Sequence, residues 1–165
     1  MKPRPRSVER EVAAALSSIF QSIDHAPVQR IPVLGRCGPD LSYNDIQLII
    51  DVKSRLKVPQ SYLAGNIPLL TEDGLVGIRL ERLLDLCWQI ASFRARLVPA
   101  SKMVWRWWEH MDDWRRDHEP QGVSALVLHR PRMPIGHATV IIHSLDRSRL
   151  CQRLRSPSHR PPTPN

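Results

Sequence analysis

Cysteine is scarce in this sequence, and its spacing excludes two common uses of the residue. Cys37, Cys87 and Cys151 are the three cysteines among 165 residues, and no two of them form a C-x-x-C pair. The seven histidines add no metal-ligand spacing. We therefore assign no metal site to these residues, and we expect a reducing, cytoplasmic compartment instead of a disulfide framework.

Long apolar stretches are missing as well. No apolar run approaches the roughly 18–20 residues that span a bilayer, and residues 12–20 are too short and too interrupted by serine to be a signal peptide. The glycine-rich loop that holds phosphates in nucleotide-binding proteins is also absent. We expect a soluble protein without a tightly bound cofactor, long enough at 165 residues for one domain with its own core.

Acidic residues are outnumbered by basic ones, and the imbalance lies at the ends of the chain. The sequence has 24 Lys and Arg against 16 Asp and Glu, a net charge of +8. Residues 1–6 are rich in Pro and Arg, and residues 147–165 in Arg, Ser and Pro. This composition predicts two basic disordered tails around a single α/β domain at residues 7–146. Such tails fit a small non-enzymatic binding protein, or they are solvated with no clear nucleic-acid or membrane partner.

Three stretches have the apolar spacing of amphipathic helices. The first runs from Ser7 to Ile23, and Ser7 suits an N-cap position. The second begins at Thr71, has Arg94 and Arg96 near its end, and is stopped by Pro99. The third covers residues 101–117 and holds four of the five tryptophans, at positions 105–114. These tryptophans could stack on nucleic-acid bases or sit at a membrane interface, but the acids among them argue against a phosphate surface. In a chain with only two Phe and two Tyr, burial is the preferred interpretation.

Three other stretches have the pattern of strands. Residues 46–55 alternate, with the side chains of Ile46, Leu48, Ile50 and Val52 on one face. Two shorter β-like runs follow at residues 123–129 and 137–144. The fold class predicted from these elements is α/β, with helices packed on a short sheet.

One pattern has the residues of a nuclease core. Pro39 and Asp40 precede an apolar run that ends in Asp51-Val52-Lys53. Two acids and a lysine at such a strand could hold Mg²⁺ and activate water. The pattern resembles that of the PD-(D/E)xK nucleases. The alternative is a strand that ends in a surface acid and lysine without any catalytic role.

A second resemblance covers the strand and the turn that follows it. The run IDVKSRLKVPQSYLAGN is similar to a segment of the BAHD acyltransferases, particularly their fungal branch. There a strand ends near a charged R-S-R, and a proline and a Tyr-(Phe/Leu)-Gly-Asn turn follow. The corresponding residues of this sequence are Asp51, Lys53, Ser54, Arg55, Pro59, Tyr62, Leu63, Gly65 and Asn66.

This resemblance implies both a fold and a function. BAHD enzymes move an acyl group from coenzyme A to a hydroxyl or an amine, on a two-layer mixed-sheet domain like that of chloramphenicol acetyltransferase. The helix expected after the turn would start near Leu75. The family's H-x-x-x-D and D-F-G-W-G motifs are absent, and Ala64 is an extra residue in the turn. The resemblance therefore implies a fragment of the second domain that is inactive alone.

Under this hypothesis the chain carries no catalytic residue of its own, and its cofactor-binding residues stay unassigned. Acyl-coenzyme A would be a substrate. The partners would be a small-molecule acyl acceptor and a chain that supplies the missing half.

Overall fold

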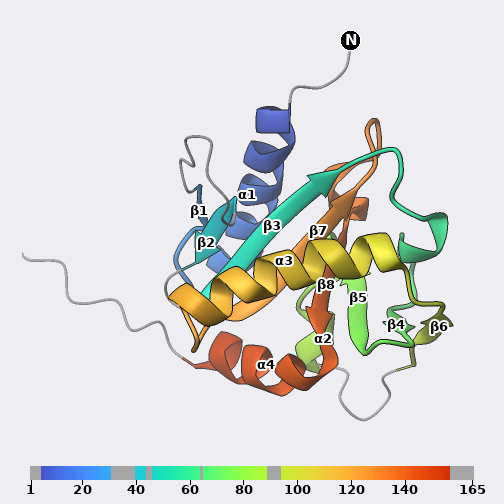
Figure 1. The fold of residues 1–165 in the computed structure, drawn as a ribbon. Coiled ribbons are helices and arrows are strands. Elements are labelled where there is room, and N and C mark those ends of the chain that lie inside the picture. The colour runs from blue at the N-terminus through green and yellow to red at the C-terminus, as the bar shows by residue number, and fades with distance from the viewer. Residues whose placement is uncertain (1–4, 31–39, 44–45, 64, 89–93, 157–165) are drawn as a thin grey trace, which may run out of the picture.

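The computed structural model describes residues 5–30, 40–43, 46–63, 65–88 and 94–156. They form a mixed α/β fold in which an open sheet has helices on both faces (Figure 1). The helices in these ranges are α1 (Pro5–Gln21), α2 (Asp85–Trp88), α3 (Lys102–His118) and α4 (Arg147–Arg155). The strands are β1 (Gln29–Arg30), β2 (Leu41–Tyr43), β3 (Leu48–Ser54), β4 (Leu69–Thr71), β5 (Leu75–Arg79), β6 (Arg96–Val98), β7 (Val123–His129) and β8 (Thr139–His143).

The sheet is mixed, and its centre is a parallel pair. The strand order is β1-β2-β3-β7-β8-β5-β4-β6. β3 pairs in parallel with β7 over its full length, from Leu48 opposite Val123 to Ser54 opposite His129. β2 and β3 are antiparallel neighbours, as are β7 and β8. The carboxyl ends of β3 and β7 therefore meet at one edge of the molecule.

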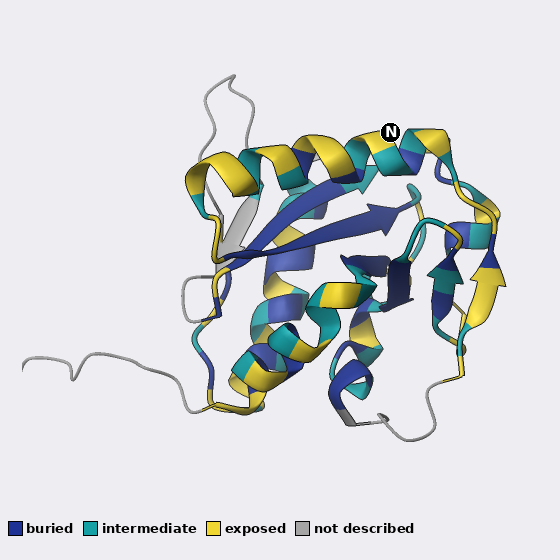
Figure 2. Cartoon of the chain, turned by 60° about the horizontal axis from the view of Figure 1, so that its bottom comes forward, coloured by how far each residue is buried: buried dark blue, intermediate teal, exposed yellow. Residues whose placement is uncertain are grey.

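Each face of the sheet has its own apolar core. On one face α1 packs against β3 and β7 through residues such as Leu16 and Phe20, and α4 adds Leu150. On the other face α3 packs through Trp108 and Met111. Both long central strands are therefore buried on both sides, as Figure 2 shows. Helices on both faces replace the two-layer arrangement predicted from the sequence.

Several predicted elements are confirmed. β3 lies within the predicted strand at residues 46–55, and β7 and β8 lie within the two shorter runs. α3 matches the predicted third helix, and the hydroxyl of Ser101 caps it by accepting a hydrogen bond from the Val104 N–H. α1 begins at Pro5, two residues before the predicted start at Ser7.

The single helix predicted between Thr71 and Pro99 is wrong. Its first part is the β4–β5 hairpin, a 3₁₀ turn at Leu80–Arg82 and the short α2 follow, and Arg96–Val98 is strand β6; residues 89–93 lie outside the described residues. Gly74 has a φ of +88° in the hairpin turn, a conformation that glycine adopts without strain. Residues 75–78 are all buried because both faces of the sheet are covered, so the alternation that marks a strand is lost. The helix that the acyltransferase resemblance places near Leu75 is likewise a strand.

The tail predicted from residue 147 is also wrong over its first part. α4 occupies Arg147–Arg155, and Leu150, Cys151 and Leu154 are buried in the core. Basic residues that suggested disorder tie this nine-residue helix to the domain, because Arg147 donates to the Leu86 carbonyl and Arg153 to the carbonyls of Ile46 and Gln121. The folded domain thus extends at least to Arg155. Residues 157–165, predicted as disordered, lie outside the described residues, as do residues 1–4.

None of the helices within the described ranges is long and apolar enough to cross a membrane.

Candidate active site

The two acids of the nuclease-like pattern lie next to each other, one just before β2 and the other in β3. Asp40 directly precedes β2, and its backbone N–H donates to the Ile50 carbonyl of β3 at 3.0 Å. Its carboxylate oxygen Oδ2 accepts a hydrogen bond from the Val52 N–H at 2.8 Å. These two bonds hold the Asp40 carboxyl against β3, where it is a hydrogen-bond partner of the Asp51 carboxyl. Pro39 lies outside the described residues.

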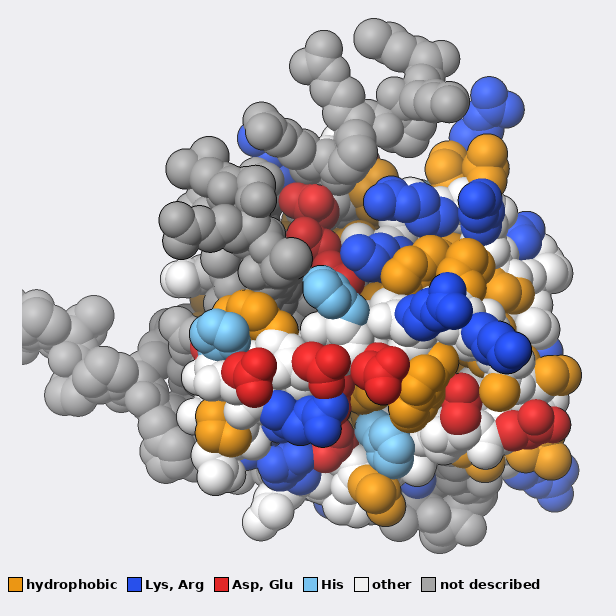
Figure 3. Space-filling view, in the orientation of Figure 1, with side chains coloured by type: hydrophobic (Ala, Val, Ile, Leu, Met, Phe, Trp, Pro, Cys, Tyr) orange, Lys and Arg blue, Asp and Glu red, His pale blue; other side chains and the backbone are white. Residues whose placement is uncertain are grey.

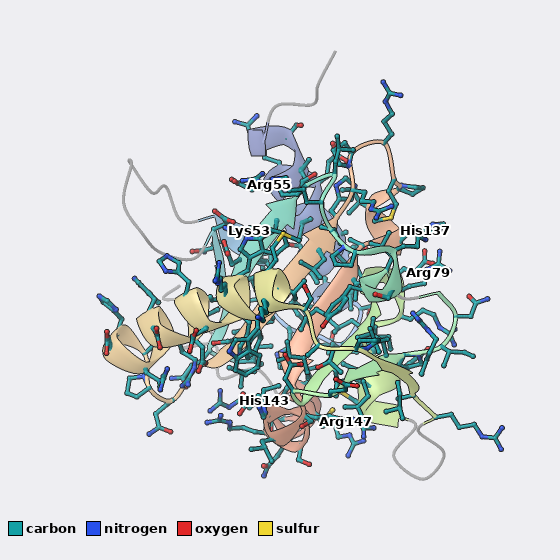
Figure 4. All side chains as sticks on the ribbon, turned by 45° about the vertical axis from the view of Figure 1, so that its right-hand side comes forward. Lys53, Arg55, Arg79, His137, His143 and Arg147 are labelled. Carbon is teal, nitrogen blue, oxygen red and sulfur yellow. The ribbon has the colours of Figure 1, made fainter. Side chains whose placement is uncertain are left out.

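Asp51 is buried and has a lysine partner on its own strand. Because side chains alternate along a strand, Asp51 and Lys53 lie on the same face of β3. The Lys53 Nζ is 3.2 Å from the Asp51 Oδ2. The Asp51 residue is only 7% exposed. Lys53 and Arg55 lie close to each other at the end of β3, as Figure 4 shows.

The protonation of Asp51 follows from this environment. Burial raises the pKa of Asp51 from 3.8 to about 7, the hydrogen bond with Asp40 adds to the rise, and the Lys53 charge opposes it. The Asp51 carboxyl thus has one carboxyl, that of Asp40, and one ammonium, that of Lys53, as neighbours. When both carboxyls are ionised the three groups carry a net charge of −1, so a proton or another cation is favoured at this position.

Asp40 and Lys53 line a cleft of about 120 Å³, and Asp51 is buried beside them. This volume holds several water molecules, since one needs about 10–15 Å³. Residues of α1, of the chain before β2 and of β3 line the cleft: Val8, Glu9, Asp40, Val52, Lys53, Ser54 and Arg55. The wall supplied by α1 brings a third acid, Glu9, to the cleft. No sequence signal marked Glu9, because its position depends on how α1 packs on the sheet.

A histidine ties the ends of β3 and β7 together. His129 is buried, and its Nε2 lies 2.7 Å from the Met133 carbonyl, which can only accept, so Nε2 carries a proton. Its Nδ1 is 2.8 Å from the Ser54 hydroxyl. These two contacts fix the strand ends that carry Lys53.

The remaining acyltransferase-motif residues have structural contacts. Tyr62 is buried, and its hydroxyl donates to the Pro99 carbonyl at 3.0 Å. Pro59 precedes a 3₁₀ turn at Gln60–Tyr62. Asn66 accepts a hydrogen bond from the Arg79 guanidinium. No contact joins these residues to Asp51 or Lys53 within the described part of the chain. Leu63 is half-buried, nothing lies within 4 Å of a Cβ built on Gly65, and Ala64 lies outside the described residues.

Two further sequence-based expectations have clear outcomes. Cys87 and Cys151 are free, buried thiols; Cys37 lies outside the described residues. Trp108 is buried in the core, and the other tryptophans of α3 are half-buried. The Trp114 ring stacks on the His118 ring, with 4.4 Å between the ring centroids. The tryptophans of α3 therefore serve mainly to pack this helix on the sheet.

No protein-family model matches this chain, and searches of curated proteins and of solved structures found no similar protein. Function is therefore inferred from the residues of the site.

Proposed function

We propose that this protein is a nuclease that uses a divalent cation to hydrolyse phosphodiester bonds, with Asp40, Asp51 and Lys53 at its centre. One observation carries the proposal: the buried Asp51 carboxyl lies beside Asp40 and 3.2 Å from the Lys53 Nζ, and both Asp40 and Lys53 line a cleft. The same three residues were selected from the sequence because they resemble the PD-(D/E)xK pattern.

The charges of the site suit a hard divalent cation. Asp40 and Asp51 offer oxygen ligands, and the two carboxylates with Lys53 are one positive charge short of neutrality. Within the described residues no group of three His, Cys, Asp or Glu is close enough to form a closed metal cage. Mg²⁺ rarely needs one, because it is commonly held by one or two carboxylates, waters and substrate phosphates. Asp40 and Asp51 would hold the cation, and Glu9 faces the same cleft.

Each group has a distinct part in hydrolysis. A bound divalent cation supplies Lewis-acid stabilisation of the phosphate and ionises water near neutral pH. The Lys53 ammonium stabilises the negative charge that develops on the phosphoryl oxygens. The attacking water gives up a proton to solvent as its oxygen bonds to phosphorus, the bond from phosphorus to the leaving sugar oxygen breaks, and that oxygen takes up a proton from solvent. Asp40 fixes the geometry because its carboxylate is anchored to the Val52 N–H.

The test is cleavage of supercoiled plasmid DNA by the purified chain in millimolar MgCl₂. Wild-type protein should nick the plasmid, and EDTA should stop the reaction. Lys53→Ala and Asp51→Asn should each lower the rate by about 100-fold or more. The matched controls are Lys102→Ala and Asp113→Asn, both at exposed positions on α3, and they should retain the wild-type rate.

Equal cleavage by wild type and Lys53→Ala would refute this function, since the activity would then come from a contaminant or another site. Absence of cleavage with Mg²⁺ and with Mn²⁺ would refute it as well. Acyl transfer, the function implied by the other resemblance, stays a prediction. It is tested in parallel with acetyl-coenzyme A and a panel of alcohols and amines.

A further inference from the structure

The chain turns sharply just after the strand that carries the site. The Val58 N–H donates to the Arg55 carbonyl at 3.3 Å, which closes a turn with Leu56 and Lys57 at its centre. The Arg55 N–H donates to the His129 carbonyl at 3.0 Å, and Val58 is fully buried. Both ends of the turn are therefore fixed to the core while its two central residues are exposed.

An arginine from the loop after β7 holds this turn from the other side. The Arg130 guanidinium donates to the Val58 carbonyl through Nε at 2.9 Å and Nη2 at 2.5 Å. Its Nη1 donates to Gln60 Oε1 at 2.8 Å. Three charge-assisted hydrogen bonds thus join segments about 70 residues apart in sequence. Arg130 is a positioning residue that presents the turn in one conformation.

Cations without a carboxylate partner gather around the turn. Arg55, Lys57 and Arg132 are exposed, and no carboxylate in the described ranges forms an ion pair with them. Several other arginines are paired: Arg79 with Glu81, Arg82 with Asp85, Arg115 with Asp112, Arg116 with Asp113 and Arg149 with Asp146. Figure 3 shows Lys and Arg side chains around hydrophobic ones at the upper right of the molecule. Of these three cations, Arg55 lines the same cleft as Asp40 and Lys53.

Leu56 is the apolar centre of this basic turn. It is 74% exposed between Arg55 and Lys57, so no core contact accounts for its size. In proteins that kink DNA, apolar side chains insert between base steps while neighbouring cations hold the phosphates. We propose that Arg55, Lys57 and Arg132 bind the DNA backbone beside the site, and that Leu56 inserts at an unstacked base step.

This inference rests on the proposed nuclease function and defines its substrate class. Unstacking costs least where the base stack is already broken, so a duplex interrupted by a gap or a mismatch is the preferred substrate. DNA is favoured over RNA because hydrolysis by water needs no 2′-hydroxyl, and because B-form grooves admit side chains that the deep, narrow A-form major groove excludes.

Binding measured in EDTA tests the inference without any cleavage. The probe is a DNA duplex with 2-aminopurine next to a one-nucleotide gap, whose emission rises when the base is unstacked. Wild-type protein should raise the emission and bind this duplex more tightly than an intact one. Leu56→Ala should abolish the rise and reduce the preference about fivefold or more. The matched control is Leu97→Ala, at a residue that is 76% exposed on β6, and it should behave as wild type.

The cations are tested by the salt dependence of the same binding. The triple variant Arg55→Ala, Lys57→Ala, Arg132→Ala should bind at least about tenfold more weakly, and its salt slope should fall by roughly one for each cation removed. The control is the triple variant Arg82→Ala, Arg94→Ala, Arg116→Ala, which lowers the net charge by the same amount and should bind as wild type does.

Four results would overturn the inference: an unchanged emission rise in Leu56→Ala, an equal loss in Leu97→Ala, an equal loss of affinity in the two triple variants, or tighter binding to an RNA duplex of the same sequence. If the wild type binds and unstacks DNA but cleaves none with Mg²⁺, the nuclease function fails and the DNA-binding turn stands.

Discussion

Asp51→Asn should make the protein more stable in alkaline solution while removing its activity. The pKa of Asp51 is raised from 3.8 to about 7 in the folded protein, so the unfolded chain binds fewer protons than the folded one between these values. Stability therefore falls as pH rises from about 4 to about 7, because the buried carboxyl must ionise beside Asp40. Asparagine resembles the protonated carboxyl and cannot ionise, so the variant escapes this cost.

The size of the effect follows from the difference between the two pKa values. A difference of about 3 corresponds to about 4 kcal/mol, which is the upper limit because it assumes that the neighbours of Asp51 do not rearrange. The Asp51 side chain is only 10% exposed, so solvent screens it little. We expect a gain of about 2–4 kcal/mol near pH 8, about 1 kcal/mol near pH 5, and none below about pH 4.

Urea unfolding followed by tryptophan fluorescence at several pH values measures this gain. Asp113→Asn serves as the control, because its side chain is 58% exposed and its replacement should change the free energy of unfolding by less than about 0.5 kcal/mol at every pH. A gain that does not vary with pH, or a loss near pH 8, would refute the buried carboxyl pair. Millimolar MgCl₂ should stabilise the wild type near pH 8 and leave Asp51→Asn unchanged, because the variant lacks one of the two ligands.

Two further predictions concern elements that the sequence did not identify. Gly77→Ala should destabilise the protein by about 1–3 kcal/mol, because a Cβ at this position would lie 2.7 Å from a side-chain carbon of Ile141. Gly65→Ala is the control, since its Cβ would enter open space and should leave the stability unchanged. Urea unfolding of both variants shows whether β5 has this close contact. Leu150→Ala should lower the free energy of unfolding by about 2–5 kcal/mol because the residue is 1% exposed. Leu145→Ala, at a residue that is 84% exposed, should lower it by less than about 0.5 kcal/mol. Equal effects of the two variants in thermal unfolding would show that residues 147–155 are not packed on the core, as the composition predicted.

The elements that could be predicted from sequence are those whose local pattern survives in the fold. β3 combines β-branched residues with a clear start and end, so residues 46–55 indicated a strand without tertiary information. α3 has a serine N-cap and an apolar stripe, and it covers residues that the pattern selected. The pairing of Asp40 with Asp51-Val52-Lys53 was likewise visible as spacing along the chain, although nothing in it distinguished a site from a surface acid and lysine.

The errors arose where burial depends on distant segments. Residues 75–78 are buried on both faces by helices from elsewhere in the chain, so their apolar run fitted a helix and a strand equally. α4 is rich in arginine and looked disordered, but Leu150 and Leu154 pack on a core that includes residues of α1, more than 100 positions away. The composition of a segment gives its charge, but it does not show whether another part of the fold packs against its few apolar residues.

The sequence by itself determined which chemical groups this protein can use: two aspartates, one lysine and a basic turn at residues 55–57 close to one strand. Only the tertiary structure decided how close these groups lie to one another and how far each is buried. Pairing of β2 with β3 sets the Asp40 carboxyl against Asp51, α1 closes one wall of the cleft, and α3 and β7 take Asp51 out of water. Burial in this environment raises the pKa of Asp51 to about 7, and the negative charge of the ionised carboxyls can then be neutralised by a bound cation.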